Sequence, residues 1–235
     1  MNAIVTGATK GIGKSISLQL AANNFNLALC ARNLQELENF RNEILESYPA
    51  LTVLIFKANL EVNREVQDFA KFVESNFPFT DVLINNAGLF IPSALLDEDD
   101  QAFDRQMQVN VKTPQVLSTI FGRKMKQEKK GHIVNICSVA SINPVENAGS
   151  YSVTKFALLG LTKVLRMELM NYGVKVTAIL PGSTLTSSWD GTGIPANRFV
   201  NPGDIASAVM SSLKMSAGAN VDEVIITPLR GDVNS

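Results

Sequence analysis

The sequence predicts an α/β protein organised as a doubly wound parallel sheet of about seven strands, a Rossmann fold with helices on both faces. Seven apolar runs of strand length alternate with segments of helical period, and a glycine-rich turn joins the first run to the first helical segment. Near-continuous apolar strands separated by crossover helices are typical of a parallel sheet buried on both faces. The length of 235 residues and the 46% apolar content predict a single domain over residues 1–235.

The expected strands and helices follow one another regularly along the chain. The strand runs are 3–5, 27–30, 51–56, 82–84, 132–137, 174–180 and 224–227. The helical patterns are 12–23, 34–47, 62–76, 99–127, 151–171 and 203–214. The last of these has clear start signals, with Asn201 as N-cap, Pro202 at the first helical position and Asp204 in the first turn.

Pro114 interrupts the long helical pattern of residues 99–127. Proline has no N–H, so the carbonyl of Asn110, four residues earlier, loses its usual helical donor. A simple kink is one expectation. The other is that this carbonyl and a water molecule link Lys155 to solvent as a proton path.

Composition excludes several classes of partner. The net charge is −1 and the pI about 5.9, with both signs mixed along the chain, so we expect neither nucleic acid nor an anionic membrane as partner. The N-terminal residues carry no basic, apolar leader pattern, which predicts a cytoplasmic protein. Cys30 and Cys137 lie in apolar runs and are expected to be buried hydrophobes, and His132 has no neighbour at metal-ligand spacing, so no metal site is expected.

The turn from Gly7 to Gly13 has the spacing G-x-x-x-G-x-G between the first strand and the first helix. Glycines permit close backbone approach, and the helix N-terminus offers free N–H groups to a pyrophosphate, so a dinucleotide is the expected ligand. A purely structural turn is one alternative. A P-loop is another, because Lys14 and Ser15 follow Gly13, although Ala8 replaces its opening glycine and Asn85 stands where magnesium would need an aspartate.

Residues after the second strand predict which dinucleotide is bound. Enzymes that prefer NAD commonly have a carboxylate there for the ribose 2′-hydroxyl, but this chain has Arg32 and Asn33. Arg32 and Lys10 could instead hold a 2′-phosphate, which predicts NADPH, with two solvated charges as the alternative. At the end of the fourth strand, the segment from Asn85 to Gly88 is expected to line the adenosine ribose, unless it is a simple turn.

Tyr151 and Lys155 lie four residues apart in a helical pattern, so they share one face. A cation about 4 Å from a phenol, at an effective dielectric constant of ~20, favours the ionised phenol by roughly 4 kcal/mol. A phenol made acidic in this way can exchange a proton with an oxygen whose charge changes during a reaction. Ser138, after a core strand, could donate a hydrogen bond to the same oxygen. The alternative is that Tyr151 and Lys155 are ordinary surface residues and that Ser138 is a turn residue at the end of a strand.

Together, the glycine-rich turn, Asn85-Asn86-Ala87-Gly88, Asn110, Ser138, the Tyr151/Lys155 pair and Pro181-Gly182-x-x-x-Thr186 resemble the short-chain dehydrogenase/reductase family. The resemblance runs from residue 3 to about 215. It implies hydride transfer between a nicotinamide and a carbonyl carbon, with Tyr151 as general acid/base and Ser138 positioning the substrate. It also implies that Lys155 makes the tyrosine more acidic and holds the nicotinamide ribose, and that Asn110 completes a proton relay.

The expected contacts with the cofactor, NADP(H), come from all parts of this edge of the sheet. They are Gly7, Thr9, Lys10, Gly11, Ile12, Gly13, Arg32, Asn33, Asn59, Leu60, Asn86, Ala87, Gly88, Tyr151, Lys155, Pro181, Gly182, Thr184 and Thr186. Asn59 departs from the family pattern, in which aspartate often contacts adenine; its amide oxygen can accept the same bond more weakly. Residues 183–200, rich in glycine and polar side chains, are expected to form a substrate lid, with an ordinary surface loop as the alternative.

Within the family, the pattern most resembles 3-oxoacyl-[acyl-carrier-protein] reductases, which implies an acyl-thioester substrate. The C-terminal segment, residues 221–230, differs from those reductases and looks more like relatives acting on small 3-hydroxy acids or sepiapterin-like ketones. An NADP-binding regulator or scaffold without catalysis is the alternative outside enzymes. The resemblance also implies a homodimer or homotetramer assembled through the helices near 99–127 and 151–171. Phe156 and Leu159 lie off the helical stripe formed by Leu158, Leu161 and Leu165, so they could meet the partner.

Overall fold

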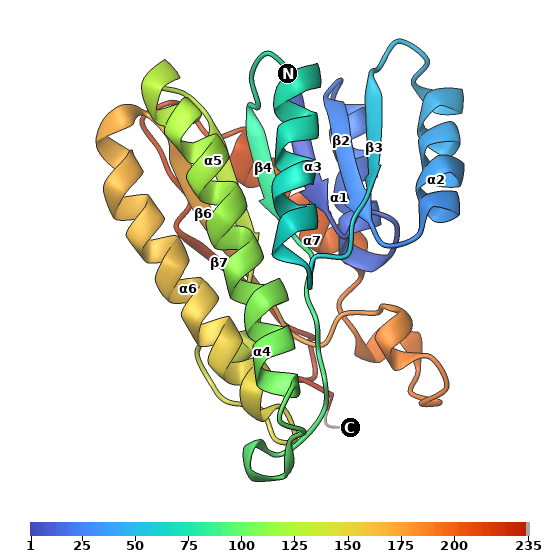
Figure 1. Ribbon diagram of the computed structural model, residues 1–235. Coiled ribbons are helices and arrows are strands. Elements are labelled where there is room, and N and C mark those ends of the chain that lie inside the picture. The colour runs from blue at the N-terminus through green and yellow to red at the C-terminus, as the bar shows by residue number, and fades with distance from the viewer. Residues whose placement is uncertain (234–235) are drawn as a thin grey trace.

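The computed structural model describes residues 1–233 and contains a seven-stranded sheet in the order β3-β2-β1-β4-β5-β6-β7 (Figure 1). Every neighbouring pair of strands in it is parallel. The strands are β1 (Asn2–Thr6), β2 (Asn26–Ala31), β3 (Val53–Lys57), β4 (Val82–Asn85), β5 (His132–Ile136), β6 (Lys175–Pro181) and β7 (Glu223–Ile226). The predicted fold class is confirmed.

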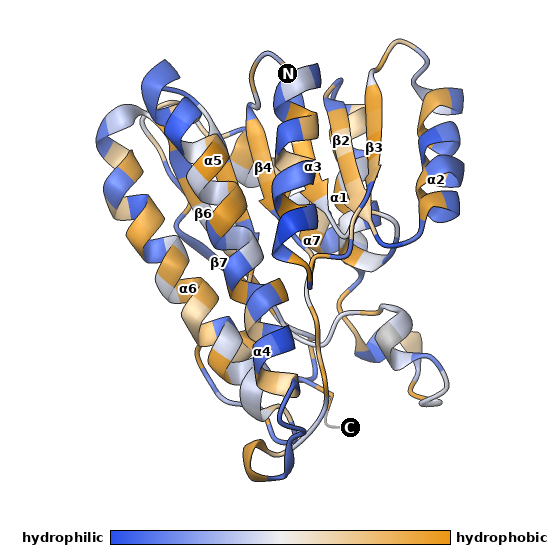
Figure 2. Ribbon diagram, viewed as in Figure 1, coloured by the Kyte–Doolittle hydropathy of each residue, from blue (hydrophilic) through white to orange (hydrophobic). Residues whose placement is uncertain are grey.

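Helices cover both faces of the sheet. On one face lie α1 (Gly11–Ala22), α2 (Leu34–Ser47) and α7 (Pro202–Leu213), and on the other lie α3 (Asn63–Asn76), α5 (Thr113–Glu128) and α6 (Gly149–Leu169). Side chains of β1 alternate between the two apolar layers, with Ala3 and Val5 in the first and Ile4 in the second. Figure 2 shows the apolar strands between helices whose outer faces are polar. Within residues 1–233, no helix is both long and apolar enough to cross a bilayer.

The sheet topology places a crevice at the carboxyl ends of β1 and β4. Strand order runs outward from β1 in one direction and from β4 in the other, and in such sheets ligands bind where the direction reverses. The glycine-rich turn follows β1, and Asn86 follows β4, so both lie at this crevice. Strand boundaries differ from prediction by one or two residues; β3, for example, begins at Val53 because Leu51 belongs to a turn in which its N–H donates to Tyr48 O at 3.2 Å.

The helical run predicted over residues 99–127 is present from Ala102 to Glu128, but a π-helical turn divides it. The chain forms α4 (Ala102–Met107), a π-helical turn (Gln108–Lys112) and then α5, with Pro114 in the first turn of α5. Thr113 N–H donates to Gln108 O, five residues back, which widens the helix before the proline. π-helical turns are frequent at functional sites, and this one carries Asn110.

His132, the chain's one histidine, makes stability sensitive to acid. Its Nε2 lies 2.7 Å from Thr177 Oγ1 in the core, and burial, with a smaller contribution from Lys175, lowers its pKa from 6.5 to about 4. Above pH 6.5 the imidazole is neutral in both the folded and unfolded chains, so it contributes no pH dependence. Between pH 6.5 and 4 only the unfolded chain takes up the proton, so the free energy of unfolding should fall by roughly 3 kcal/mol as the pH is lowered through this range.

Urea unfolding of the wild type and of His132→Gln at pH 7.5, 5.5 and 4.5 measures this effect. Because glutamine does not titrate, the wild type should lose more unfolding free energy than the variant as the pH falls. Equal losses in the two proteins would show that His132 is not responsible.

Candidate active site

The glycine-rich turn and the end of β4 are joined by hydrogen bonds. Asn86 Nδ2 donates to Thr6 O at 2.8 Å and to Gly7 O at 3.1 Å, while Thr6 Oγ1 accepts the N–H groups of Asn86 and Ala87, both at 3.0 Å. A Cβ on Gly13 would lie 2.2 Å from Gly7 O and 2.5 Å from Asn86 Nδ2. The segment from Asn85 to Gly88 is therefore more than a turn, because it sets the shape of the glycine-rich loop.

The N-terminus of α1 fits a phosphate. Lys10 occupies the N-cap without a side-chain cap hydrogen bond, and the first turn holds no acidic residue. Its N–H groups and positive helix end are thus available to an anion, in contrast to α2, which the side chain of Asn33 caps. Lys14 does not act as a P-loop lysine: its ammonium lies 2.7 Å from Glu43 and over the ring of Phe40.

Glu36 was missed by the sequence analysis and lies among the residues expected to bind a 2′-phosphate. Its carboxylate is 2.8 Å from Lys10 Nζ and accepts a hydrogen bond from Thr9 Oγ1 at 3.2 Å. The hydrogen bond from Lys10 is the largest cause that lowers the pKa of Glu36, and the charge of Arg32 adds to the effect. Helix α2 begins right after Asn33, so its first turn brings position 36 back over the glycine-rich loop.

Asn59 is engaged within its own loop. Its Oδ1 accepts the N–H of Glu61 at 3.1 Å, and its N–H donates to Glu65 at 2.7 Å. The amide oxygen expected to contact adenine thus already has one donor and keeps a single lone pair for another. Leu60 is buried, and its carbonyl oxygen accepts from Thr113 Oγ1 at 3.1 Å, which ties this loop to the start of α5.

Tyr151 and Lys155 lie together near the N-terminus of α6. Lys155 Nζ is 5.6 Å from the centre of the Tyr151 ring and donates to Ile136 O, at the end of β5, at 2.9 Å. The lysine is 4% exposed, whereas the tyrosine is half-buried, so the phenol reaches the surface of the crevice while the cation lies beneath it. One ammonium proton is used by Ile136, which leaves two donors for other groups.

Ser138 stands two residues beyond β5, as the N-cap of a short 3₁₀ turn, Val139–Ser141. Its Oγ accepts the N–H of Ala140 at 3.1 Å, which leaves the hydroxyl proton free to donate toward the crevice. The neighbouring Cys137 is buried, and burial raises the pKa of its thiol to about 11. Burial likewise raises that of Cys30 to about 12, so both behave as the small hydrophobes expected.

Asn110 connects three parts of the site through its side chain. Its Oδ1 accepts the N–H of Leu89 at 2.7 Å, and its Nδ2 donates to Leu89 O and to Thr154 Oγ1, each at 2.9 Å. Thr154 in turn precedes Lys155 on α6. The proton path expected through the backbone carbonyl of Asn110 stays a prediction.

The segment after β6 approaches the glycine-rich turn. A Cβ on Gly11 would lie 2.9 Å from Thr186 Cγ2. The two ends of residues 183–200 lie side by side, since Val200 N–H donates to Ser183 O and Leu185 N–H to Val200 O, both at 2.9 Å. Thr184 is buried and donates to Gly182 O at 2.9 Å. The predicted lid thus leaves and rejoins the protein at one point beside the crevice.

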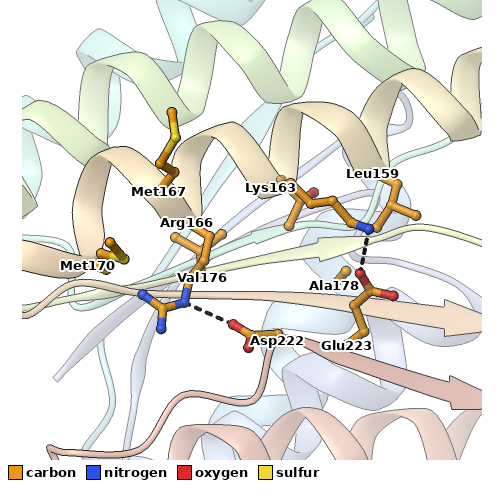
Figure 3. Close-up of a pocket in the computed structure, with 10 residues that line it drawn as sticks. Leu159, Lys163, Arg166, Met167, Met170, Val176, Ala178, Asp222 and Glu223 are labelled. Atoms are coloured by element: carbon orange, nitrogen blue, oxygen red, sulfur yellow. Dashed lines mark hydrogen bonds and ion pairs between the residues drawn. The ribbon is translucent and has the colours of Figure 1, made fainter.

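A further groove lies on another part of the protein. It has a volume of about 390 Å³ between α6 and the strands β6 and β7, and two ion pairs, Lys163 with Glu223 and Arg166 with Asp222, cross it (Figure 3). Neither Tyr151 nor Ser138 lines it. The groove is therefore separate from the catalytic candidates.

Known proteins resemble this chain over nearly its whole length. A family model described as short chain dehydrogenase matches residues 1–193. An uncharacterized oxidoreductase of Staphylococcus epidermidis is 33% identical over 228 residues, which cover 97% of this chain and 96% of that protein. A Staphylococcus aureus protein described in the same words is 30% identical over 230 residues, with 97% and 96% coverage.

Two solved structures share the fold. An alcohol dehydrogenase from the archaeon Thermococcus sibiricus, complexed with 5-hydroxy-NADP, superposes with a TM-score of 0.89 at 26% identity, covering 100% of this chain and 99% of its own. A metagenomic short-chain oxidoreductase in complex with NADP superposes with a TM-score of 0.84 at 30% identity, covering 97% and 96%.

Proposed function

Because the chain belongs to the short-chain dehydrogenase family, we propose that it is an NADP(H)-dependent oxidoreductase that interconverts a carbonyl compound and a secondary alcohol at Tyr151. The observation that carries the proposal is the buried ammonium of Lys155, 5.6 Å from the centre of the Tyr151 ring, at the edge of the sheet that also bears the glycine-rich turn. The bound cofactor supplies the chemistry of hydride exchange with a carbonyl carbon.

The protein's own residues handle the charge on the substrate oxygen. As that oxygen becomes negative, Tyr151 Oη gives it a proton and Ser138 Oγ donates a hydrogen bond, so both groups stabilise the transition state more than the ground state. Lys155 lies beside the phenol, with its ammonium 5.6 Å from the ring centre, and its two free donors are available to ribose hydroxyls. The side chain of Asn110 contributes indirectly, because its hydrogen bonds hold Leu89 and Thr154 in place.

NADPH is the proposed cofactor. The uncapped N-terminus of α1 suits the pyrophosphate, and Lys10 and Arg32 suit the 2′-phosphate. The two relatives solved with 5-hydroxy-NADP and NADP support this choice. Glu36 opposes it, because its carboxylate pairs with Lys10 where the phosphate would bind.

Replacing Glu36 with glutamine should therefore tighten NADPH binding. The change removes one negative charge beside Lys10, and we expect Kd for NADPH to fall about two- to fivefold, the size of an exposed ion pair, with Kd for NADH unchanged. Calorimetric titration measures both constants. Glu43→Gln is the matched control, since it breaks another exposed ion pair between α1 and α2, that of Glu43 with Lys14. Weaker NADPH binding by Glu36→Gln would contradict the assignment.

Two substrate classes follow from the sequence, and an assay separates them. The first is a 3-oxoacyl thioester, and the second is a small 3-hydroxy acid or sepiapterin-like ketone. Oxidation of NADPH in the presence of an acetoacetyl thioester, and reduction of NADP⁺ in the presence of 3-hydroxy acids, are followed at the absorbance of the reduced cofactor. A chain that binds NADPH yet converts no member of a broad panel would instead be the regulator or scaffold considered above.

The proposed assembly is a homodimer or homotetramer formed through α6 and α5. An exposed apolar stripe at helical spacing runs along α6 through Val153, Phe156, Val164 and Met167. Leu159, expected to face the partner, is instead buried in an apolar cluster with Leu158 and residues of β6, because the helix covers β6 with a broad face. Phe156→Glu should lower the mass measured by light scattering to that of a monomer; an unchanged mass would place the interface elsewhere.

A further inference from the structure

Phe90 forms one wall of the crevice beside Tyr151. The two rings meet edge to face, with centroids 5.0 Å apart. The residues on either side of Phe90 are fixed by buried amides of the α4 region: Leu89 pairs with Asn110 through two hydrogen bonds, and Ile91 N–H donates to Gln106 Oε1 at 3.2 Å. Gln106 and Asn110 are both fully buried, so this short stretch is held rigidly and Phe90 is presented to the phenol.

The loops around this wall form an apolar rim. After β4, Leu95 and Leu96 are exposed; after β5, Ile142 and Val145; and after β6, Leu185. Backbone hydrogen bonds join the first two loops, since Ser93 N–H donates to Asn147 O at 2.9 Å and Gly149 N–H to Ser93 O at 3.0 Å. An exposed apolar surface around a catalytic residue is typical of a site that binds an apolar ligand.

The loop segments that carry this rim are strongly acidic. The segments 89–101, 139–148, 183–200 and 227–233 hold seven carboxylates and two guanidinium groups, a net charge of −5, although the whole chain carries only −1. The acidic residues are Asp97, Glu98, Asp99, Asp100, Glu146, Asp190 and Asp232, and the basic ones are Arg198 and Arg230. Glu98 accepts hydrogen bonds from the N–H and the hydroxyl of Ser150, so one of these carboxylates lies beside the residue that precedes Tyr151.

From these observations we infer the substrate class: an uncharged, largely apolar ketone, or the matching secondary alcohol, held against Phe90. The inference rests on the proposed function. Bound NADPH would supply the hydride to the ketone carbon, the π electrons of the C=O bond would move to oxygen, and Tyr151 would give that oxygen a proton, so that the products would be a secondary alcohol and NADP⁺. The acidic rim disfavours anions, so of the substrates proposed above we expect sepiapterin-like ketones and uncharged thioesters to react well, and free oxo and hydroxy acids and acyl groups on an acidic carrier to be poor substrates.

A matched pair of probes tests the role of charge. Ethyl 3-oxobutanoate and the 3-oxobutanoate anion share the reacting group and differ in charge. We expect kcat/KM for the ester to exceed that for the anion at least tenfold at low ionic strength. The ratio should fall in 0.5 M salt because salt screens the charges of the rim; the Debye length is about 10 Å at 0.1 M and shorter at higher concentration. An anion that is reduced as fast as the ester would overturn the inference.

Charge variants locate the effect. The triple change Asp97→Asn, Asp100→Asn and Glu146→Gln should raise kcat/KM for the anion severalfold and leave that for the ester within twofold. The control makes the same change in net charge at exposed carboxylates on α2, α3 and α5, by Glu46→Gln, Glu74→Gln and Glu128→Gln. It should alter kcat/KM for neither the anion nor the ester. Equal effects of the two triple variants would overturn the assignment to the rim.

The contact with Phe90 has its own test. Phe90→Ala should lower kcat/KM for ethyl benzoylacetate about tenfold through KM, with Kd for NADPH unchanged, and Phe90→Leu should restore part of the loss because it restores apolar area. No loss in Phe90→Ala would overturn this contact. If NADPH binds and neither ester is reduced but another member of the panel is, or if esters and anions are reduced equally, only the substrate class fails; if no member of the panel is converted, the proposed function fails as well.

Discussion

Tyr151→Phe should lower kcat by at least about a hundredfold while leaving NADPH binding within about twofold of the wild type. The substitution removes only the hydroxyl, and general acid catalysis by a positioned group contributes about 10²- to 10⁴-fold. Phenylalanine keeps the ring that packs edge to face against Phe90, so the fold and the wall of the crevice are expected to persist. Stopped-flow measurement of NADPH oxidation gives the rate, and fluorescence titration gives Kd.

Tyr172→Phe is the matched control for that experiment. Tyr172 lies just after α6, where its ring contacts Lys126, 4.3 Å from the ammonium and outside the crevice. Its loss should leave kcat unchanged. A Tyr151→Phe enzyme that keeps more than a tenth of wild-type kcat would require another proton donor and would contradict the role given to Tyr151.

Gly13→Ala should remove measurable cofactor binding. The new methyl group would lie 2.2 Å from Gly7 O and 2.5 Å from Asn86 Nδ2, so the glycine-rich loop and the end of β4 would have to separate. Neither neighbour is the flexible tip of a long side chain, and the displaced loop is the one that faces the pyrophosphate. We expect Kd for NADPH to rise at least a hundredfold and the thermal midpoint to fall as well.

The control for the glycine substitution is Gly218→Ala. A Cβ at Gly218 meets no atom within 4 Å, and its backbone lies outside the left-handed region, so the change should alter neither Kd nor the thermal midpoint. Measurement of both proteins by calorimetry separates a local effect on the loop from the general cost of replacing a glycine. A Gly13→Ala protein that binds NADPH normally would show that the loop does not cradle the cofactor.

The sequence predicted the sheet well because its strands are short apolar runs bounded by polar turns. It also predicted that Tyr151 and Lys155 would meet, since four residues on a helix fix their spacing whatever surrounds them. Pro114 correctly indicated an irregularity in the long helical pattern. The π-helical turn itself depends on side chains from elsewhere, including Thr154 and the backbone of Leu89, so local periodicity contained no signal for it.

The roles of Glu36 and Phe90 depend on contacts in the folded chain that the hydrophobic periodicity of the sequence does not reveal. The search for a carboxylate ended at Arg32 and Asn33, but a helical turn returns Glu36 to the same place, so a search through the first turn of α2 would have found it. Phe90 was missed because its role comes from contact with Tyr151, 61 residues later. The hydrogen bond that Asn59 Oδ1 accepts from Glu61 N–H could have been predicted, because asparagine side chains often bond the backbone two residues further along in turns.

The most direct test of the account is the fate of a labelled hydride. The protein is mixed with NADPH carrying deuterium at the transferable C4 position and with ethyl 3-oxobutanoate, and the product is analysed by mass spectrometry and NMR. The account predicts an alcohol with one deuterium on the carbinol carbon, formed by the wild type and not by Tyr151→Phe. Bound NADPH with no labelled alcohol from this ester, or labelled alcohol formed equally by both proteins, would contradict it.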